Sequence, residues 1–291
     1  MLNRMILLTS VLVLSSLIAI GCGGTSVPDS PEGTVVTVAK ELANNNPGVL
    51  WDAMPASYQT DVETLVHEAA AKIDAEVYDK AFVIANKAVD LLKDKKDFIL
   101  GLPLLKEGFV AMMIKDQNAL EDNWNDIVDV LEILTTSDLE TLDSLKSLDV
   151  GDFVATTGGK LMGQFQKLSD LATDPTMAET WDKLASVDVE VKSTEGDKAV
   201  IEIKVEGEDP ETMTMVKVEG KWIPEDMAKD WKENIEEMKA NVAEMTAGLS
   251  ADQKTNMLAQ MAGVEQIVDQ LAKAETQEEF TQIVMSLMGG M

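Results

Sequence analysis

The single histidine of the chain, His67, is the residue type best suited to catalytic or metal chemistry. It precedes Glu68 in the segment VHEAAAKID, and these two residues match the start of the zinc-protease motif HExxH. That motif requires a second histidine four residues later, where this chain has Ala71, and a zinc site needs three or four ligands. A serine-histidine-aspartate triad is also disfavoured, because the sequence contains no GxSxG nucleophile elbow. We therefore interpret His67 as a helical residue, either at the surface or half-buried.

A second segment with chemical potential is TTGGKL, residues 156–161. It lacks the glycine spacing of a phosphate-binding loop and ends in leucine where serine or threonine is required, so we interpret it as a weak point within a helix. Paired carboxylates carry little information, because 52 acidic residues bring such pairs together by chance. The sequence therefore predicts no catalytic residues and no cofactor, and it favours a protein that is not an enzyme.

Methionine is the unusual residue of this composition, with 17 in 291 residues. Thioether sulfurs bind Cu(I). Met213 and Met215 lie two apart on a predicted strand, and Met285, Met288 and Met291 are spaced by three at the end of the sequence. Methionine is also a flexible filler of apolar cores. We favour that packing role and predict no metal site, with Cu(I) binding as the alternative.

The only cysteine, Cys22, follows an uncharged run from Met5 to Ile20 that is preceded by Arg4. This layout is typical of a secretory signal peptide, and the run is shorter than the roughly 20 residues that a membrane-spanning helix needs. The segment AIGC, which ends in Cys22, resembles the lipobox of bacterial lipoproteins, with alanine at the position where leucine is usual. The resemblance implies cleavage after Gly21 and attachment of acyl chains such as palmitate to Cys22. An ordinary secretory signal with an incidental cysteine is the alternative.

This reading divides the chain into a lipoprotein signal peptide at residues 1–21, a flexible tether at 22–31 and a single folded body at 32–291. The tether sequence CGGTSVPDSP is rich in small residues and proline, which disfavour regular structure. A cysteine with more than one acyl chain stays anchored stably, whereas a single chain does not. We therefore expect a protein of the bacterial cell envelope, anchored to a membrane by the lipid on Cys22 and facing the periplasm or the exterior.

The charge of the chain argues against nucleic acid as a partner. Arg4 is the only arginine, and the formal net charge at pH 7 is -28. An acidic protein with a single arginine repels phosphate backbones and lacks the planar guanidinium groups that recognise phosphates and bases. The same charge repels an anionic bilayer, so membrane attachment must come from the lipid. The hydrophobic fraction of 45% is sufficient for a folded core.

Apolar residues spaced by three and four positions predict helices over residues 32–185. The first helix ends at the breaker NNNPG, and a long helical stripe runs over residues 58–92 until KDKKD interrupts it. The most apolar segment, 98–114, is interrupted by glycine, proline and charged residues, which favours a buried helix pair over a membrane span. Capping boxes are predicted at three pairs of residues: Ser137 with Glu140, Ser250 with Gln253, and Thr276 with Glu279.

The hydrophobic period changes to two over residues 187–223. The segment VDVEVKSTEGDKAVIEIKVEG alternates apolar and polar residues on both sides of Gly196 and Asp197, which is typical of a β-hairpin. A further strand follows and turns at Glu219 and Gly220. The fold class is therefore α+β and predominantly helical, with one small antiparallel sheet of three to four strands and with helices again over residues 224–288.

Two segments resemble a known group of domains. TVVTVAKELANNNPGVLWDAMPASYQ at residues 34–59 and VKVEGKW at 216–222 resemble nuclear-transport-factor-2-like, or cystatin-like, lipoprotein domains. They cover less than a fifth of the chain, and a helical block from about Asp61 to Leu184 separates them. The sequence GKWIP after a hairpin is also similar to uncharacterised bacterial envelope lipoproteins. These resemblances imply a location and a fold without implying a reaction.

The leading hypothesis from the sequence is a non-enzymatic envelope lipoprotein that acts as an interaction or structural module with a protein partner. The alternative is a small-ligand binding domain of the cystatin-like kind. Its pocket would lie between the sheet and the covering helices, and Trp222 and Trp231 would line it.

Overall fold

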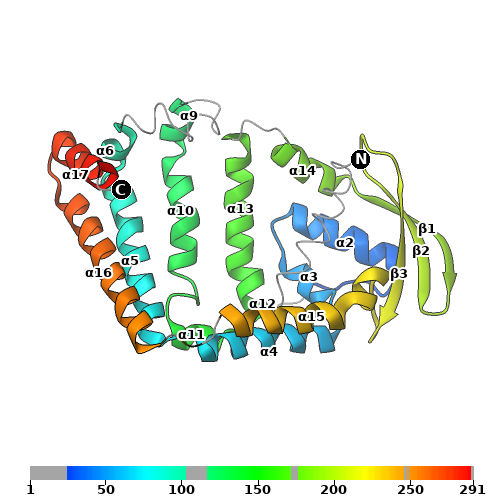
Figure 1. The fold of residues 1–291 in the computed structure, drawn as a ribbon. Helices are drawn as coiled ribbons and strands as arrows, with labels where there is room; N and C mark the ends of the chain where they lie inside the picture. The colour runs from blue at the N-terminus through cyan, green and yellow to red at the C-terminus, as the bar shows by residue number, and fades with distance from the viewer. Residues whose placement is uncertain (1–24, 103–116, 172–175, 246–247, 249, 290–291) are drawn as a thin grey trace. The chain divides into compact units, whose positions relative to one another are not determined.

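A computed structural model describes residues 25–102, 117–171, 176–245, 248 and 250–289 (Figure 1). Within these residues the fold is predominantly helical α+β with a four-stranded antiparallel sheet, which confirms the predicted fold class. The expected signal peptide, Cys22 and most of the apolar segment 98–114 lie outside the described residues. None of the described helices combines the length and the hydropathy required to cross a bilayer.

The described residues group into two compact units. The first unit takes its residues from the ranges Met1–Ala71, Lys146–Gly163 and Thr176–Ala247, and the second from Lys72–Leu145, Gln164–Pro175 and Gly248–Met291. The single folded body that the sequence suggests for 32–291 stays a prediction, and each unit is described by itself.

The first unit contains the sheet and the helices packed on it. Its helical elements are α2 (Pro31–Ala43), α3 (Gly48–Asp52), most of α4 (Ala56–Lys72), α12 (Val150–Phe153), the π-helical segment η2 (Val154–Gly158), the first half of α13 (Gly159–Leu168), α14 (Thr176–Ala185) and α15 (Glu225–Met245). Helix α2 begins at Pro31, one residue earlier than the sequence predicts, because the Ser30 side chain accepts a hydrogen bond from the Gly33 amide at 3.1 Å and Pro31 occupies the first turn.

The sheet is a meander in the order β1-β2-β3-β4. Its strands are β1 (Asp188–Glu195), β2 (Lys198–Lys204), β3 (Glu211–Val218) and β4 (Lys221–Pro224). The predicted turns are present: Gly196 has a φ of 59°, and Glu219 and Gly220 have φ values of 50° and 81°, which suit two-residue hairpin loops. The alternating apolar residues of β2, including Ile201 and Ile203, form one buried face that packs with Val35 of α2.

Residues 25–30, which belong to the expected tether, make specific contacts with the first unit. The Thr25 amide donates to Asp52 Oδ2 at 2.7 Å, and Asp29 forms an ion pair with Lys217 at 2.6 Å. Burial raises the pKa of Asp52, although the hydrogen bond from Thr25 lowers it. Val27 packs on the core cluster that contains Leu42 and Leu50. Residues 25–30 therefore contact the folded unit, where the sequence predicts a flexible tether.

The helical stripe predicted over residues 58–92 is two helices in the structure, α4 and α5 (Ala75–Asp94). The break occurs at Asp74, whose side chain accepts hydrogen bonds from the amides of Glu76 at 3.1 Å and Val77 at 3.2 Å. An aspartate that caps the first amides of a helix specifies a new N-terminus. The apolar period continues across the break and therefore conceals it.

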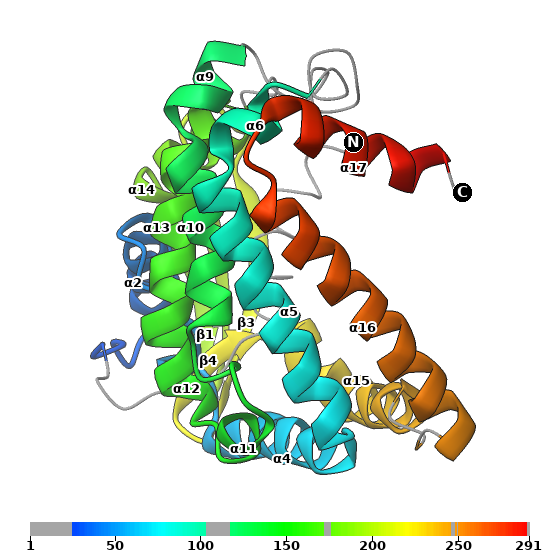
Figure 2. The same cartoon turned by 90° about the vertical axis from the view of Figure 1, so that its left-hand side faces the viewer.

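The second unit is helical in its described residues. It contains α5, α6 (Lys96–Leu100), α9 (Gln117–Asp122), α10 (Trp124–Thr135), most of α11 (Leu142–Lys146), the end of α13, the 3-10 turn η3 (Ser169–Leu171), α16 (Ala251–Lys273) and α17 (Gln277–Gly289). Helix α5 lies between α10 and α16 in both views (Figures 1 and 2). Phe280 of α17 is buried among Leu91, Leu102 and Val268, which together form a core of this unit.

The three predicted capping boxes have different outcomes. The Ser250–Gln253 box is confirmed in full. Thr276 accepts from the Glu279 amide at 3.2 Å, but the Glu279 carboxylate bonds to the Glu275 amide instead of that of Thr276. The box at Ser137 is wrong as a helix start, because Ser137 stabilises a turn and α11 begins only at Leu142.

An ion-pair group joins α5 and α16 within the second unit. Glu265 forms ion pairs with Lys80 and with Lys87, and Lys87 also pairs with Asp269 at 2.9 Å. Hydrogen bonds from Lys80 and then Lys87 hold the pKa of Glu265 below its ordinary value. Because the pKa of Glu265 is lower in the folded protein, the unfolded chain takes up a proton at this residue first as the pH falls. The ion pairs therefore contribute fully to stability above the unfolded-state pKa of about 4.3. This contribution is lost as the pH falls through the lower pKa of the folded state.

We expect Glu265→Gln to lower the urea midpoint at neutral pH, and to bring the midpoints of variant and wild type together between about pH 5 and pH 3. Urea unfolding at several pH values measures this difference. The matched control is Glu140→Gln, which changes an exposed glutamate in the turn before α11 and is expected to leave the pH profile unchanged. A constant gap between wild type and Glu265→Gln across the pH range would contradict the role of the ion pair.

Candidate functional site

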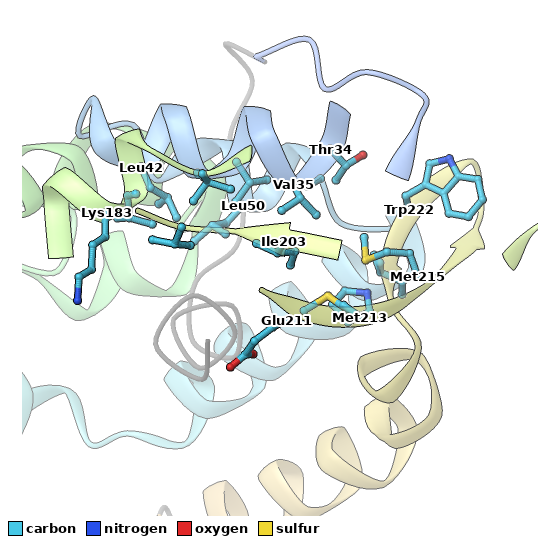
Figure 3. Close-up of a pocket in the computed structure, with 18 of the residues that line it drawn as sticks. Thr34, Val35, Leu42, Leu50, Lys183, Ile203, Glu211, Met213, Met215 and Trp222 are labelled. Carbon is cyan, nitrogen blue, oxygen red and sulfur yellow. The ribbon is translucent and has the colours of Figure 1, made fainter. Parts of the chain in front are cut away.

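The first unit contains an apolar cavity of about 330 Å³, which is at the small end of the range typical of ligand sites (Figure 3). Helix α2 covers one side with Thr34, Val35 and Leu42, and the sheet covers the opposite side with Ile203 and other residues (Figure 3). Helix α14 and the chain after α3 close the remaining sides. The elements that surround the cavity are far apart in sequence, so only the tertiary fold assembles it.

Methionines supply an unusual share of the lining. Five thioether side chains contribute to it: Met54, Met162, Met213, Met215 and Met227. Methionine is unbranched and polarizable, so a wall of methionines can adapt to ligands of different shapes. The packing role that the sequence favours for Met213 and Met215 agrees with this position, since Met215 is buried in the sheet core. Met285 is exposed on α17, and the side chains of Met288 and Met291 lie outside the described residues.

Four charged residues line the cavity: Lys183, Glu208, Asp209 and Glu211. Lys183 Nζ lies 2.8 Å from Glu208 Oε1 and 3.9 Å from a Glu179 carboxylate oxygen. The hydrogen bond to Glu208 raises the pKa of Lys183, so the ammonium stays charged through the physiological range. Asp209 and Glu211 are exposed to solvent. Every other described residue of the lining is uncharged, so among these residues the charge lies in the segment after β2, at the first residue of β3 and at one residue of α14.

Trp222 of β4 lines the cavity, as the sequence predicts, and is only 6% exposed. Its indole Nε1–H is buried without a hydrogen-bond acceptor among the described residues. Lys217 lies over the indole ring at 5.8 Å from the ring centroid, in a cation–π arrangement. A buried donor without an acceptor costs about 1–3 kcal/mol of stability.

Trp231 does not line the cavity, which corrects the sequence-based expectation. Its ring stacks on Tyr58 of α4 with centroids 4.0 Å apart and an interplanar angle of 2°, and its Nε1–H donates to Asp61 Oδ2 at 2.9 Å. The helical period of α15 places this residue toward α4, where burial raises the pKa of Tyr58. Trp181 of α14 lines the cavity instead.

His67 has a structural environment within the first unit. It is half-buried in α4, and its Nε2 lies 2.9 Å from the carbonyl oxygen of Leu148. Because a carbonyl can only accept, Nε2 carries the proton in this contact. No group of three or more histidine, cysteine, aspartate or glutamate side chains with metal-binding geometry occurs in the described part of the chain.

The segment TTGGKL lies at a helix irregularity, in agreement with its interpretation as a weak point. Residues Val154–Gly158 form a π-helical turn between α12 and α13. A Cβ on Gly159 would approach the Asn45 carbonyl oxygen to 3.0 Å, so this position accommodates a close backbone contact. The glycines therefore serve packing against the loop after α2.

Sequence reasoning missed the contribution of α14. Thr180, Trp181, Lys183 and Leu184 all line the cavity. The amphipathic pattern of this helix indicates a buried face, but the pattern does not indicate which surface that face covers. The lysine in the last turn, next to Trp181 and Leu184 on the apolar face, is the one signal that could have drawn attention to it.

No protein-family model matches this chain, and neither a curated protein nor a solved structure is significantly similar to it. The fold and the cavity alone define the class of this protein: an α+β protein with an apolar cavity between an antiparallel sheet and its covering helices. Its resemblance to cystatin-like lipoprotein domains stays a prediction.

Proposed function

We propose that this chain is an envelope lipoprotein whose first unit binds a small apolar ligand in the cavity between α2, α14 and the sheet. The observation that carries the proposal is the cavity itself, whose walls are mostly aliphatic and thioether side chains. Ligand sites have this character: a concave, mostly apolar surface with a few polar groups. The sequence alone favours an interaction module. We place ligand binding ahead of that function because a cavity lies between the sheet and its covering helices, where a closely packed core would have argued against a ligand site.

The driving force for binding would be the removal of apolar surface from water, worth about 25 cal/mol per Å². The lining offers such surface on both sides, from Val35 and Leu42 on α2 and from Ile203 on β2 (Figure 3). The five methionines adjust to the shape of the ligand at little cost. These properties favour recognition by shape and hydrophobicity over recognition by a hydrogen-bond pattern.

The experiment is a fluorescence titration of the purified protein, in detergent-free buffer, with the neutral apolar probe N-phenylnaphthylamine. We expect a saturable increase in emission with one site for each chain, because the probe moves from water into an apolar environment. An increase that stays linear with probe concentration would indicate unspecific partition and would contradict the proposal.

The lipoprotein part of the proposal predicts that Cys22→Ser leaves a precursor that is neither cleaved nor acylated. The serine hydroxyl does not replace the thiol that the acyl transfer requires, and cleavage before the residue depends on that modification. Metabolic labelling with palmitate and the intact mass of the protein measure both steps. Ser26→Ala, a change of a nearby small residue, is the control and should be processed normally. Normal cleavage and membrane retention of Cys22→Ser would refute the assignment.

The remaining expectations about function stay predictions. They are the absence of an enzymatic activity, a role for a protein partner and the lack of nucleic-acid binding. Crosslinking of the membrane-anchored protein in cells, followed by mass spectrometry of the captured chains, tests the second of them. A reproducible partner would restore the interaction module as the leading function.

A further inference from the structure

The cavity has two chemically different ends. Lys183 and Trp222 lie at opposite ends of the lining in the close-up view (Figure 3). The Trp222 end is buried, whereas Asp209 and Glu211 line the cavity and are exposed to solvent. Residues that both line a cavity and contact solvent mark the place where it opens. The polar end of a bound ligand would therefore lie beside Lys183 and the acidic residues.

The balance of charge at this end is negative. Lys183 is the only cationic residue among the described residues that line the cavity, and its ammonium group is already paired with Glu208 at 2.8 Å. Asp209 and Glu211 also line the cavity, are exposed to solvent and follow Glu208 closely in the sequence. An anionic headgroup that binds Lys183 would have to displace Glu208, and the part of the cavity that opens to solvent carries these two further acidic residues. Like charges at close range in a partly desolvated site oppose binding strongly.

We propose that the ligand is an amphiphile with an alkyl body and a neutral or cationic polar end, and that the rim of carboxylates excludes anionic amphiphiles such as fatty acids. This inference rests on the proposed function and adds the chemical class of the ligand to it. The alkyl body occupies the wall of aliphatic and methionine side chains, and the polar end reaches the solvent beside Glu208 and Glu211. The apolar walls would contact neutral, cationic and anionic amphiphiles in the same way. Electrostatic repulsion by the carboxylates is therefore what discriminates against the anionic amphiphile.

The experiment compares three amphiphiles that share one alkyl chain and differ only in charge: decanol, decylamine and decanoate. Each is titrated against the complex of N-phenylnaphthylamine with the purified protein, at neutral pH and low ionic strength, below its solubility limit and any micellar concentration. We expect decanol and decylamine to displace the probe, and decanoate to need at least a tenfold higher concentration. Added salt should narrow this difference, because it screens charges at the exposed rim.

A charge-reversal variant separates the rim from the overall charge of the protein. Glu211→Lys should strengthen displacement by decanoate at least fivefold, because it removes one repulsive carboxylate and adds a cation where the cavity opens. Glu195→Lys makes the same change of net charge at an exposed residue of β1 outside the lining, and should leave displacement by decanoate unchanged. If Glu211→Lys does not fold, Glu211→Gln tests the same point with a smaller expected gain.

The outcomes distinguish the two proposals. Saturable binding of the probe with equal displacement by all three amphiphiles would overturn the charge selection and leave the apolar site intact. Equal effects of Glu211→Lys and Glu195→Lys would also overturn it, because the discrimination would then come from the net charge of the whole chain. If the probe shows no saturable binding, the proposed function itself fails.

Discussion

Val35→Phe should weaken the binding of N-phenylnaphthylamine at least tenfold while the protein stays folded. Val35 extends from α2 into the cavity opposite Ile203 (Figure 3). A phenyl ring at this position can occupy part of the 330 Å³ volume that the probe would fill. Because the space exists before the substitution, we expect a change in unfolding free energy below about 1 kcal/mol, in contrast to the 1–3 kcal/mol typical of overpacked cores.

The matched control for this prediction is Val36→Phe. Val36 is the next residue of α2 and is half-buried, but it does not line the cavity. The substitution is chemically identical, so it corrects for any general effect of a larger side chain on the helix. Probe titration and urea unfolding of both variants provide the measurements. A strong loss of stability in Val35→Phe without a loss of affinity would show that the probe binds elsewhere.

Phe280→Ala should lower the unfolding free energy of the second unit by about 3–5 kcal/mol, the range typical of large aromatic deletions in cores. Phe280 is 2% exposed and packs in the cluster that contains Leu91 and Val268. Its ring lies 5.8 Å from the Phe98 ring at an interplanar angle of 55°, a tilted arrangement that aromatic pairs favour. Because whole domains are stable by only about 5–15 kcal/mol, this loss is a large fraction of the total.

Phe165→Ala provides the comparison in the same unit. Phe165 is 45% exposed, so its removal leaves little or no internal cavity, and we expect a loss of less than about 1 kcal/mol. Urea unfolding followed by circular dichroism measures both variants. Similar losses for the two substitutions would mean that Phe280 is not a core residue of the second unit.

Local signals in the sequence were sufficient to predict most of the secondary structure. The breaker NNNPG marks the end of α2, and the turn residues Gly196 and Gly220 mark two hairpins. These features depend on hydrogen bonds and backbone angles of neighbouring residues, which the sequence states directly. The break at Asp74 was missed because the apolar period continues from α4 into α5, and period was given more weight than a single capping residue.

The cavity required the tertiary structure. Trp222 and Trp231 both lie at positions that could face the sheet and its covering helices, yet Trp222 lines the cavity and Trp231 stacks on Tyr58. Their local patterns do not distinguish these outcomes, because a period indicates which residues share a face and not which element that face contacts. The wall formed by α14 is a further example, since its buried side meets residues of α2 that lie about 140 positions earlier.

The amino-acid sequence by itself determined the helical α+β class, the position of the sheet, and the expectation of an acylated Cys22, because these rest on residue type, period and short motifs. Only the tertiary structure decided that α2, α14 and the sheet enclose an apolar cavity and that Lys183 is paired with Glu208 at its rim. The reason is physical: a cavity is the volume that side chains from distant segments leave unfilled, and no single segment carries a signal for it.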